Sequence, residues 1–322
     1  MTIYFITGGF GFLGQYIVQA LHDHDPGAEL RVLGRTHRKT LLGVENLENM
    51  RWIQGDLSEP ETFRTELEGV DAIIHNAALV SFRKSDADAI YQANVIGTRN
   101  LAQTALEADC KNFIFISSIS AVGFNPDGIS DEMMMPDMEY KREHDMYGYS
   151  KRTSELELME MTDKMRIITL NPSVVLGPGS DRIEAVFRMA RYLPALPMLS
   201  YINSFVDVRD VAQAVVLALT KGRNGERYIV TAHNVEMLSF AKAALKAAGK
   251  KTLLFPVSGP GVRILDAILW VMDVLKLNPG IRRPSEMAVD KALSWEKIQR
   301  EMGWKPQYSL EQSISDSVPS RV

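Results

Sequence analysis

The sequence contains very little cysteine: Cys110 is the single thiol among 322 residues. One thiol excludes an internal disulfide and a metal centre built from several cysteine ligands. The six histidines, at positions 22, 24, 37, 75, 144 and 233, show no spacing that is typical of metal ligands. We therefore expect no bound metal, and we expect Cys110 to be a small residue at a helix end rather than a reactive thiol.

The sequence also lacks an excess of charge of either sign. It has 36 lysines and arginines against 40 aspartates and glutamates, which gives a net charge of −4. Acids and bases are interspersed along the chain, and this balance does not favour nucleic acid as a partner. No basic and apolar leader precedes the first apolar run, which begins at Ile3. We therefore expect no signal peptide and a cytoplasmic location.

What the sequence does contain is a regular alternation of strand-like apolar runs with helical segments. The predicted strands are Thr2–Thr7, Leu30–Leu33, Met50–Gln54, Ala72–His75, Asn112–Ser117 and Arg166–Leu170. The predicted helices between them are Gly11–His24, Glu59–Leu67, Asp86–Asp109 and Asp145–Asp163. This alternation predicts an α/β protein with a doubly wound parallel sheet and helices on both faces. Such sheets bind ligands beyond the carboxyl ends of their strands.

A glycine-rich loop directly follows the first predicted strand. Gly8, Gly11 and Gly14 stand three residues apart, and apolar residues at helical spacing come after them. In such a strand–loop–helix unit the first glycine permits a tight turn and the second lets a pyrophosphate approach the backbone. The third allows the helix to pack closely on the strand. Because the free N–H groups of the helix N-terminus then face the phosphates, the loop predicts a dinucleotide site.

A second signal is the pair Tyr147 and Lys151, four residues apart within a predicted helix. At this spacing both side chains leave the same helical face. An ammonium beside a phenol favours the phenolate and lowers the tyrosine pKa toward neutrality. Such a tyrosine can give or take the proton when a carbonyl and a hydroxyl interconvert. Taken alone, the pair is equally typical of an exposed helical face.

Together these landmarks resemble the extended short-chain dehydrogenase/reductases, the NAD-dependent epimerase/dehydratase superfamily, in order and over nearly the whole chain. The matching segments are Thr7-Gly8-Gly9-Phe10-Gly11-Phe12-Leu13-Gly14, Gly55-Asp56-Leu57, His75-Asn76-Ala77-Ala78, Asn94, Ser117-Ser118, Tyr147 with Lys151, Asn171-Pro172-Ser173 and Phe205–Val211. Within the superfamily, the sequence is more similar to the 3β-hydroxysteroid dehydrogenase and dihydroflavonol reductase branches than to the sugar-nucleotide branch.

The resemblance implies the roles of four active-site residues. Tyr147 would exchange the proton with the substrate oxygen, and Lys151 would lower its pKa and bind the nicotinamide ribose. Ser118 would position and polarise the carbonyl, and Asn94 would support the site through backbone and water contacts. The nicotinamide would supply the hydride chemistry. His75 is interpreted as a strand-end residue rather than a ligand.

Further residues are predicted to contact the cofactor and the substrate. The cofactor set is Thr7, Gly8, Gly9, Phe10, Gly11, Phe12, Leu13, Gly14, Arg35, Arg38, Asp56, Leu57, Asn76, Ala77, Ala78, Ser117, Tyr147, Lys151, Pro172, Ser173 and Val174. The substrate set is Val80, Ser81, Phe82, Ser120 and Phe205. By the resemblance Asp56 would reach the adenine, and a turn aspartate is the alternative interpretation.

The identity of the dinucleotide is predicted from the charge that follows the second strand. An NAD site usually carries an acid about twenty residues past the glycines, and that position here is Gly34. Arg35 follows it, with Arg38 and Lys39 close behind. A guanidinium suits a 2′-phosphate. The segment therefore favours NADP as the cofactor, with NAD as the alternative.

The chain is expected to form two units. Residues 1–170, with 205–230 returning to them, would form the dinucleotide-binding domain. Residues 171–204 and 231–322, where the alternation weakens, would form a smaller, mainly helical substrate lobe. The apolar helix predicted at Gly261–Leu277 is too short and too charged to span a bilayer, and we expect it in the core of that lobe. A lid over a hydrophobic substrate and a peripheral membrane contact are the alternatives.

The sequence thus predicts an NAD(P)-dependent oxidoreductase that interconverts a ketone or aldehyde and an alcohol on a fairly hydrophobic small molecule. A steroid-, flavonoid- or ketoacyl-like compound would suit. The alternative is a sugar-nucleotide epimerase with tightly bound NAD, and a cofactor-sensing protein without catalysis is a third hypothesis. Because the family often pairs two long helices, we also expect a homodimer with contacts from Leu101, Ala105, Leu156 and Met159.

Overall fold

The computed structural model describes residues 1–318 except 126–127, 181–194, 258, 275–283 and 288. A sheet of seven strands lies at its centre, and every pair of neighbouring strands runs parallel. Its order is β3 (Met50–Gln54), β2 (Glu29–Gly34), β1 (Ile3–Thr7), β4 (Ala72–His75), β5 (Asn112–Ile116), β6 (Arg166–Pro172) and β10 (Arg227–Val230). The order reverses between β1 and β4, where doubly wound sheets bind their ligands. The predicted fold class is confirmed.

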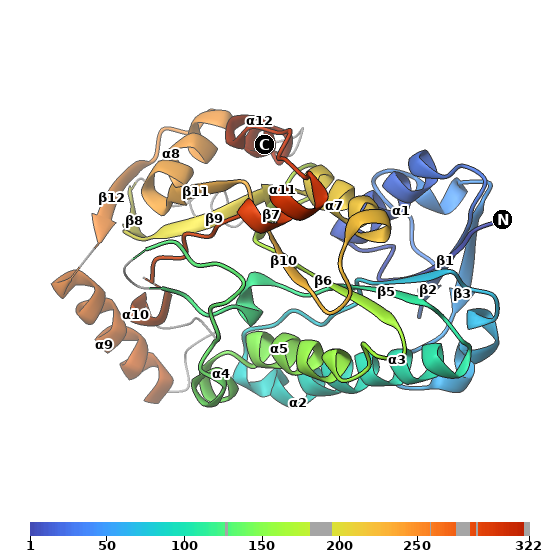
Figure 1. Ribbon diagram of the computed structural model, residues 1–322. Coiled ribbons are helices and arrows are strands. Elements are labelled where there is room, and N and C mark those ends of the chain that lie inside the picture. The colour runs from blue at the N-terminus through green and yellow to red at the C-terminus, as the bar shows by residue number, and fades with distance from the viewer. Residues whose placement is uncertain (126–127, 181–194, 258, 275–283, 288, 319–322) are drawn as a thin grey trace.

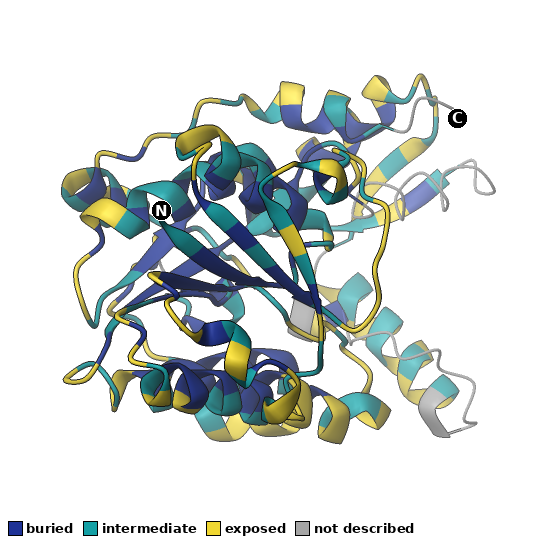
Figure 2. Ribbon diagram, turned by 90° about the vertical axis from the view of Figure 1, so that its right-hand side faces the viewer, coloured by how far each residue is buried: buried dark blue, intermediate teal, exposed yellow. Residues whose placement is uncertain are grey.

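Helices cover both faces of this sheet (Figure 1). One layer consists of α1 (Phe12–His24), α7 (Val208–Lys221) and α11 (Glu296–Met302), and the other of α2 (Ala87–Tyr91), α3 (Gly97–Glu107) and α5 (Met146–Met159). Successive strand residues point to opposite faces, so that Ile6 packs in the α1 and α7 core and Phe5 in the α3 and α5 core. Figure 2 shows the buried residues gathered on the sheet and on the inner faces of the helices.

Two of the predicted helices differ in the structure. The segment Glu59–Leu67 forms two 3-10 turns, Pro60–Thr62 and Arg64–Leu67, rather than a helix. The Thr62 hydroxyl donates to the Glu59 carbonyl and accepts from the Asp56 N–H, and such local bonds compete with a helix. The segment 86–109 contains a π-helical turn at Gln92–Ile96 between α2 and α3. Turns of this kind often occur at functional sites.

The second lobe contains more strand than expected. β9 (Ile202–Asp207) lies between β7 (Val174–Leu176) and β11 (His233–Glu236), and β8 (Ala195–Leu199) pairs with β12 (Leu253–Val257). Helices still account for more of the lobe's described residues than strands do, as predicted. Proline hides the last pair in the sequence, because Pro197 and Pro256 interrupt the strand pattern. Both belong to a two-stranded sheet, where every strand is an edge strand and a missing N–H is tolerated.

Helices complete the lobe around these strands. α8 (Met237–Ala247) and α12 (Leu310–Asp316) pack on the three-stranded sheet, where Phe205, Phe240 and Ile314 form a core of their own. The short α4 (Met138–His144) directly precedes α5. None of the described helices is long and apolar enough to cross a membrane.

One helix of the lobe, α9 (Pro260–Val274), projects from it next to α10 (Pro284–Met287) (Figure 1). Ile264, Ile268 and Trp270 on this helix are 61%, 51% and 56% exposed. The expectation of a core helix is therefore wrong for this surface. The predicted continuation of the helix to Leu277 lies outside the described residues.

Two further expectations about packing change. Trp304, which follows α11, is fully buried in the core of α1 and α7, so this stretch packs with the central sheet rather than with the substrate lobe. Leu101 and Ala105 are fully buried against the sheet and are not available for the predicted dimer contacts. Leu156 and Met159 are 43% and 50% exposed on α5 and remain available.

Candidate functional site

A cavity of about 730 Å³ lies at the carboxyl ends of the central strands and extends to the second lobe. Most of the predicted site residues line it: Gly8, Phe10, Gly11, Phe12, Leu13, Arg35, Arg38, Asn76, Ala77, Ala78, Val80, Phe82, Ser117, Ser118, Ser120, Tyr147, Lys151, Pro172, Ser173 and Val174. Residues from five strand ends and from α5 thus meet in one space, as expected for a doubly wound sheet.

The glycine loop forms a narrow cradle at one end of this cavity. Gly8 has a φ of 70°, and a Cβ on it would lie 2.8 Å from the Ala77 nitrogen. A Cβ on Gly14 would lie 2.0 Å from the Gly8 carbonyl oxygen. Both positions therefore require glycine, one for its backbone angle and one for the close approach of α1 to the loop. Gly9 and Gly14 lie beneath the cavity wall rather than in it.

The N-terminus of α1 opens into the same cradle. Its N-cap residue, Gly11, has no side chain to satisfy the free N–H groups of the first turn, and Phe12 and Leu13 of that turn line the cavity. Free N–H groups at a helix N-terminus form a ready site for a phosphate. The donors and the space that the glycines leave therefore fit the pyrophosphate of a dinucleotide.

Beyond the cradle, a basic segment follows β2. Arg35 and Arg38 line the cavity together with Gly34 and Thr36. The Arg35 side chain is 80% exposed, and its guanidinium lies 4.0 Å from the carboxylate of Asp56. Hydrogen bonds from Ser58 and the charge of Arg35 hold the Asp56 pKa below its usual value, although burial opposes this shift. Asp56 itself is not part of the described cavity wall.

The aromatic ring of Phe10, in the glycine loop, borders this basic segment, because a Cβ on Gly34 would lie 3.3 Å from it. It lies 5.6 Å from the ring of His37, which in turn lies 5.3 Å from Trp52. The Trp52 indole donates to the carbonyl of Gly34 at 3.3 Å. This row of rings fixes the backbone at the end of β2, from which Arg35 extends.

Tyr147 enters the cavity from the first turn of α5. That turn begins at Asp145, whose carboxylate caps the helix by accepting from the Gly148 N–H at 3.1 Å. Tyr147 is 9% exposed, and the ring of Phe82 stands edge-on to it at 6.0 Å. The phenol is therefore shielded from bulk water while it faces the cavity.

Lys151 lies one helical turn further along α5. It is 2% exposed, and its ammonium donates to the Ile116 carbonyl at 2.8 Å and lies 4.7 Å above the ring of Phe115. Burial lowers the pKa of Lys151 to about 7, and the charge of Glu155 opposes that shift. The predicted neighbours of one helical face therefore do come together at the cavity, with the lysine close to its titration point.

Ser118 lies at the end of β5, where the chain turns into a short 3-10 turn at Ile119–Ala121. Its hydroxyl oxygen accepts from the Ser120 N–H at 3.1 Å. Because a hydroxyl can accept and donate at once, its hydrogen can still be directed at an oxygen in the cavity. The carbonyl of Ser118 accepts from Asn171 Nδ2 at 3.0 Å.

Asn94 lies in the π-helical turn behind the cavity wall. Its amide accepts from the Leu79 N–H at 2.7 Å and donates to the Leu79 carbonyl and to Ser150 Oγ, both at 3.0 Å. The side chain thereby ties the chain after β4 to α5. Asn94 itself is not part of the described cavity wall.

His75 links the segment after β4 to the π-helical turn through a chain of hydrogen bonds. The Thr98 hydroxyl donates to the Asn94 carbonyl, so it must accept from His75 Nε2, at 2.8 Å. His75 Nδ1 must then accept from the Thr7 hydroxyl at 2.7 Å, which accepts from the Ala77 N–H at 3.1 Å. Complete burial lowers the pKa of His75 to about 3, so it is neutral and joins the cofactor segment to the π-helical turn.

The far end of the cavity, where a substrate would lie, is mixed in character. Val80, Phe82 and Phe124 supply apolar surface, and Asn203 and Lys291 supply polar groups. The predicted substrate residues Ser81 and Phe205 are not in the described wall. The Ser81 hydroxyl donates to Asp86 at 2.6 Å, and Phe205 stacks on Phe240 at 4.3 Å within the core of the lobe.

Sequence reasoning also placed Thr7 and Leu57 at the cofactor. Thr7 turns toward His75, and Leu57 packs against the α3 core. Conversely, four residues of the cavity wall were not singled out from the sequence: Asp145, Phe124, Asn203 and Lys291. Asp145 had a usable signal, because an aspartate three residues before Gly148 at a helix start is typical of an N-cap. The others come from loops far apart in sequence, and no local pattern predicts that they meet.

Known proteins support the family resemblance. The sequence model of the NAD dependent epimerase/dehydratase family matches residues 4–231. The sterol demethylase protein B of Methylococcus capsulatus is 33% identical over 235 residues, which cover 70% of this chain and 68% of that protein. The 3 beta-hydroxysteroid dehydrogenase/Delta 5→4-isomerase of Mycobacterium tuberculosis is 25% identical over 348 aligned positions, covering 98% of this chain and 90% of that protein. The crystal structure of gox2253 has a TM-score of 0.82 and 25% identity, covering 98% of this chain and 97% of its own.

Proposed function

The chain belongs to the NAD dependent epimerase/dehydratase family, and on that premise we propose that it is an NADP-dependent reductase of a ketone or aldehyde. Membership makes it a nicotinamide-dependent dehydrogenase or reductase of the extended short-chain type. The observation that carries the proposal is the meeting of Tyr147, Lys151 and Ser118 with the glycine cradle in one cavity. The reaction would interconvert the carbonyl and an alcohol on a fairly hydrophobic small molecule.

Each of these residues has a definite task in such a reaction. The bound nicotinamide would supply or accept the hydride. Tyr147 would give its proton to the carbonyl oxygen during reduction and take it back during oxidation. The ammonium of Lys151 favours the phenolate of Tyr147 by charge. The hydroxyl of Ser118, fixed by Ser120, would donate to the same oxygen as Tyr147 and hold the carbonyl in place.

The preference for NADP is supported by the groups after β2. Gly34 offers no carboxylate to a ribose hydroxyl, and Arg35, Thr36 and Arg38 line the cavity there. Arginine presents a planar fork of donors that matches a phosphate. Arg35 also has Asp56 at 4.0 Å, which would keep the guanidinium near the adenosine end.

The substrate class is supported by the cavity wall and by relatives. Phe82, Val80 and Phe124 give the substrate end apolar surface, which suits a ring system or an acyl chain. Two relatives carry sterol or steroid substrates in their names. We therefore place steroid-like ketones first, before flavonoid- and ketoacyl-like ones.

The test measures the consumption of NADPH with a panel of steroid, flavonoid and ketoacyl carbonyl compounds. The absorbance of the reduced nicotinamide reports the reaction. At least one class should be reduced. Tyr147→Phe should lose on the order of 10²–10⁴ in rate and should bind NADPH as the unaltered protein does. Tyr149→Phe is the matched control, because Tyr149 lies on the same helix outside the described cavity wall. Normal turnover by Tyr147→Phe would remove Tyr147 from the mechanism.

A sugar-nucleotide epimerase is the second candidate, because hydride removal and return need the same three residues. The related sugar-nucleotide dehydratases use two carboxylic side chains at the end of the fifth strand as acid and base for elimination. The turn Ser118-Ile119-Ser120 has no carboxylates at that place, so we do not expect dehydration here. An epimerase keeps its cofactor bound and leaves free NADPH unchanged. Purified protein that carries tightly bound NAD, and that converts a sugar nucleotide without consuming NADPH, would favour this candidate over the reductase.

A further inference from the structure

A buried carboxylate, Glu155, lies on the inner face of α5 behind the cavity wall, with its side chain 3% exposed. One of its oxygens accepts from Ser117 Oγ at 2.5 Å and from Asn171 Nδ2 at 2.6 Å. The other accepts from Arg152 Nη1 at 2.8 Å and pairs with Arg227 Nη2 at 3.3 Å. Burying a charge is costly unless it is paired and hydrogen-bonded. Four donors from four different segments of the chain around one carboxylate therefore mark a specific arrangement.

Three of these donors also hold the chain segment that carries Ser118. Ser117 is its first residue. Asn171 uses its second amide hydrogen to donate to the Ser118 carbonyl at 3.0 Å. Arg227 donates to the carbonyl of Ala121, where the 3-10 turn ends, at 3.2 Å. The start, the middle and the end of the Ser117–Ala121 segment are therefore all linked to the same carboxylate.

The same charge acts on Lys151, one helical turn earlier on α5. Its ammonium donates to the Ile116 carbonyl, directly before the segment that Glu155 holds. Burial lowers the pKa of Lys151, and Glu155 raises it. The other charged or titratable groups around this lysine include Tyr147, Arg152 and the cap residue Asp145 on its own helix, His75 on β4 and Arg227 on β10.

We propose that Glu155 is a positioning residue of the active site, which fixes the Ser117–Ala121 segment from behind and keeps Lys151 in its ammonium form. Two observations carry this inference: the four-donor geometry, and the placement of Lys151 and Glu155 one turn apart on one helix. It deepens the proposed function and rests on it, because Lys151 matters only if a dinucleotide binds in the cavity.

The first test is the affinity for NADPH, measured by nicotinamide fluorescence across the neutral and mildly alkaline range. The affinity should fall where Lys151 loses its proton. In Glu155→Gln this fall should move to lower pH by about one unit or more, which is the usual effect of losing one adjacent charge. In Glu155→Asp, which keeps the charge, the affinity should fall at the same pH as in the unaltered protein. The 2′-phosphate also titrates near pH 6 (approximately), but equally in all variants.

The second test is hydrogen exchange of the Ser120, Ala121 and Val122 amides, which the 3-10 turn protects. The shorter side chain of Glu155→Asp cannot span from α5 to both Ser117 and Asn171, so these amides should exchange faster. Asp210→Asn is the matched control. Asp210 is also a buried carboxylate, 1% exposed, but it lies on α7, accepts from the Gln307 N–H and should change neither measurement.

The outcomes separate this inference from the proposed function. If the unaltered protein binds neither NADPH nor NADH, the proposed function fails, while hydrogen exchange still reports on the Ser117–Ala121 segment. If Glu155→Gln does not fold, the exchange of Glu155→Asp decides. Unchanged exchange in Glu155→Asp, or an unchanged pH dependence in a folded Glu155→Gln, would overturn the proposal.

Discussion

At the scale of single residues, the cavity is governed by how each charge is solvated. Lys151 is buried and close to its titration point, so its neighbours decide whether it carries a charge. The Arg35 side chain, in contrast, is 80% exposed and lies in contact with solvent. The first kind of residue suits proton chemistry, and the second suits recognition of an anionic ligand.

The first prediction concerns cofactor preference. Gly34→Asp combined with Arg35→Asn should reverse a preference for NADPH over NADH, because it adds an acceptor for the ribose hydroxyl and removes donors to the phosphate. Charge-assisted hydrogen bonds contribute roughly 1.5–3 kcal/mol each, which corresponds to at least tenfold in affinity. A Cβ on Gly34 would lie 3.3 Å from the Phe10 ring, so that ring must shift slightly in the variant.

Titration of both nucleotides into both proteins checks this prediction. Arg64→Asn is the control, because Arg64 is exposed and pairs with Glu61 and Glu107 away from the cavity. Equal dissociation constants for NADH and NADPH in the unaltered protein would contradict the assignment of NADP. In that case Arg35 would contact the adenine without recognising a phosphate.

The second prediction concerns His75 and acid stability. Its pKa is about 3 in the folded state and about 6.5 in an unfolded chain. Below pH 6.5 (roughly) the unfolded state binds a proton that the folded state refuses, so the free energy of unfolding falls as pH drops. One such proton contributes up to about 1.4 kcal/mol per pH unit. His75→Phe should lose this part of the slope, because phenylalanine takes up no proton. It should also be less stable near neutral pH, because it cannot make the hydrogen bonds of His75 to Thr7 and Thr98.

Urea denaturation at several pH values between neutral and acidic measures the slope. His24→Asn, which replaces an exposed histidine, should keep the slope of the unaltered protein. An identical slope in His75→Phe would mean that His75 takes up a proton without unfolding. The hydrogen-bond chain from Ala77 to Asn94 would then be described incorrectly.

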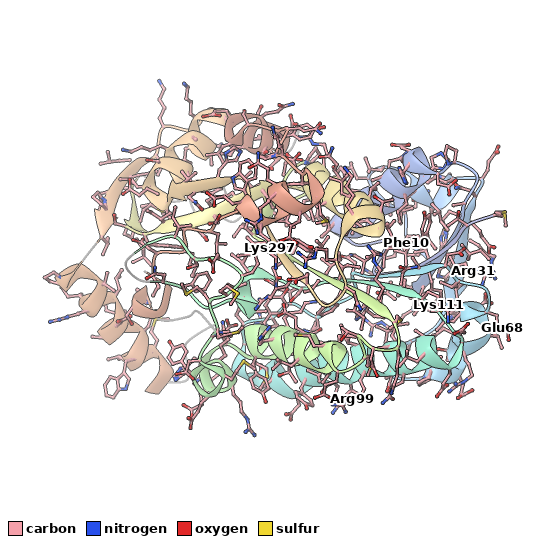
Figure 3. The ribbon with its side chains drawn as sticks, in the orientation of Figure 1. Phe10, Arg31, Glu68, Arg99, Lys111 and Lys297 are labelled. Carbon is pink, nitrogen blue, oxygen red and sulfur yellow. The ribbon has the colours of Figure 1, made fainter. Side chains whose placement is uncertain are left out.

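At the scale of elements, α5 combines three tasks. Its inner face carries Tyr147 and Lys151 into the cavity and, one turn further along, Glu155 against the end of β5. The outer face carries Leu156 and Met159, both exposed. On the same outer surface Arg99 of α3 pairs with Glu157 of α5 at 2.5 Å (Figure 3). Helices with an exposed apolar face of this kind are typical of an interface.

The third prediction is that this outer face forms a homodimer. Leu156→Lys with Met159→Lys should place two charges in the contact and convert a dimer into a monomer. Sedimentation at several concentrations measures the change. Met135→Lys is the control, because Met135 is 61% exposed on a loop outside α5. An unaltered protein that sediments as a monomer at all concentrations would reject the dimer.

The elements also show how far local sequence predicts this structure. Strands β1 to β6 and helices α1 and α5 were predicted closely, because their apolar residues follow the period of the element. The π-helical turn at Gln92–Ile96 was not predicted, since it depends on Asn94 and Thr98 bonding to groups on other elements. The same limit applies to Glu155. Its sequence position suggests an ordinary helical acid, and only the approach of Asn171 and Arg227 gives it a role.

At the scale of the whole molecule, the C-terminal segment closes the dinucleotide-binding domain. Trp304 is fully buried and its indole donates to the Asp210 carbonyl on α7 at 2.9 Å. Asp207, at the start of α7, accepts from Ser313, and Arg209 pairs with Asp316 at 2.7 Å. The domain boundaries expected from the sequence do not predict these contacts, because the chain leaves the lobe and returns to the central sheet only near its C-terminus.

The last prediction tests that closure. Trp304→Ala should lower the free energy of unfolding by about 3–5 kcal/mol, which is typical of emptying a large buried site. Trp304→Phe should cost less, because it keeps most of the buried ring and loses the hydrogen bond to Asp210. Trp270→Ala is the matched control: Trp270 is 56% exposed on α9, so its removal should change stability by no more than about 0.5 kcal/mol. Urea denaturation measures all three. If Trp304→Ala were as stable as Trp270→Ala, the C-terminal segment would be a surface attachment, and residues 295–304 would belong to the substrate lobe as the sequence first suggested. The burial of Trp304 in the core of α1 and α7, together with its bond to α7, instead predicts that its loss destabilises the central sheet.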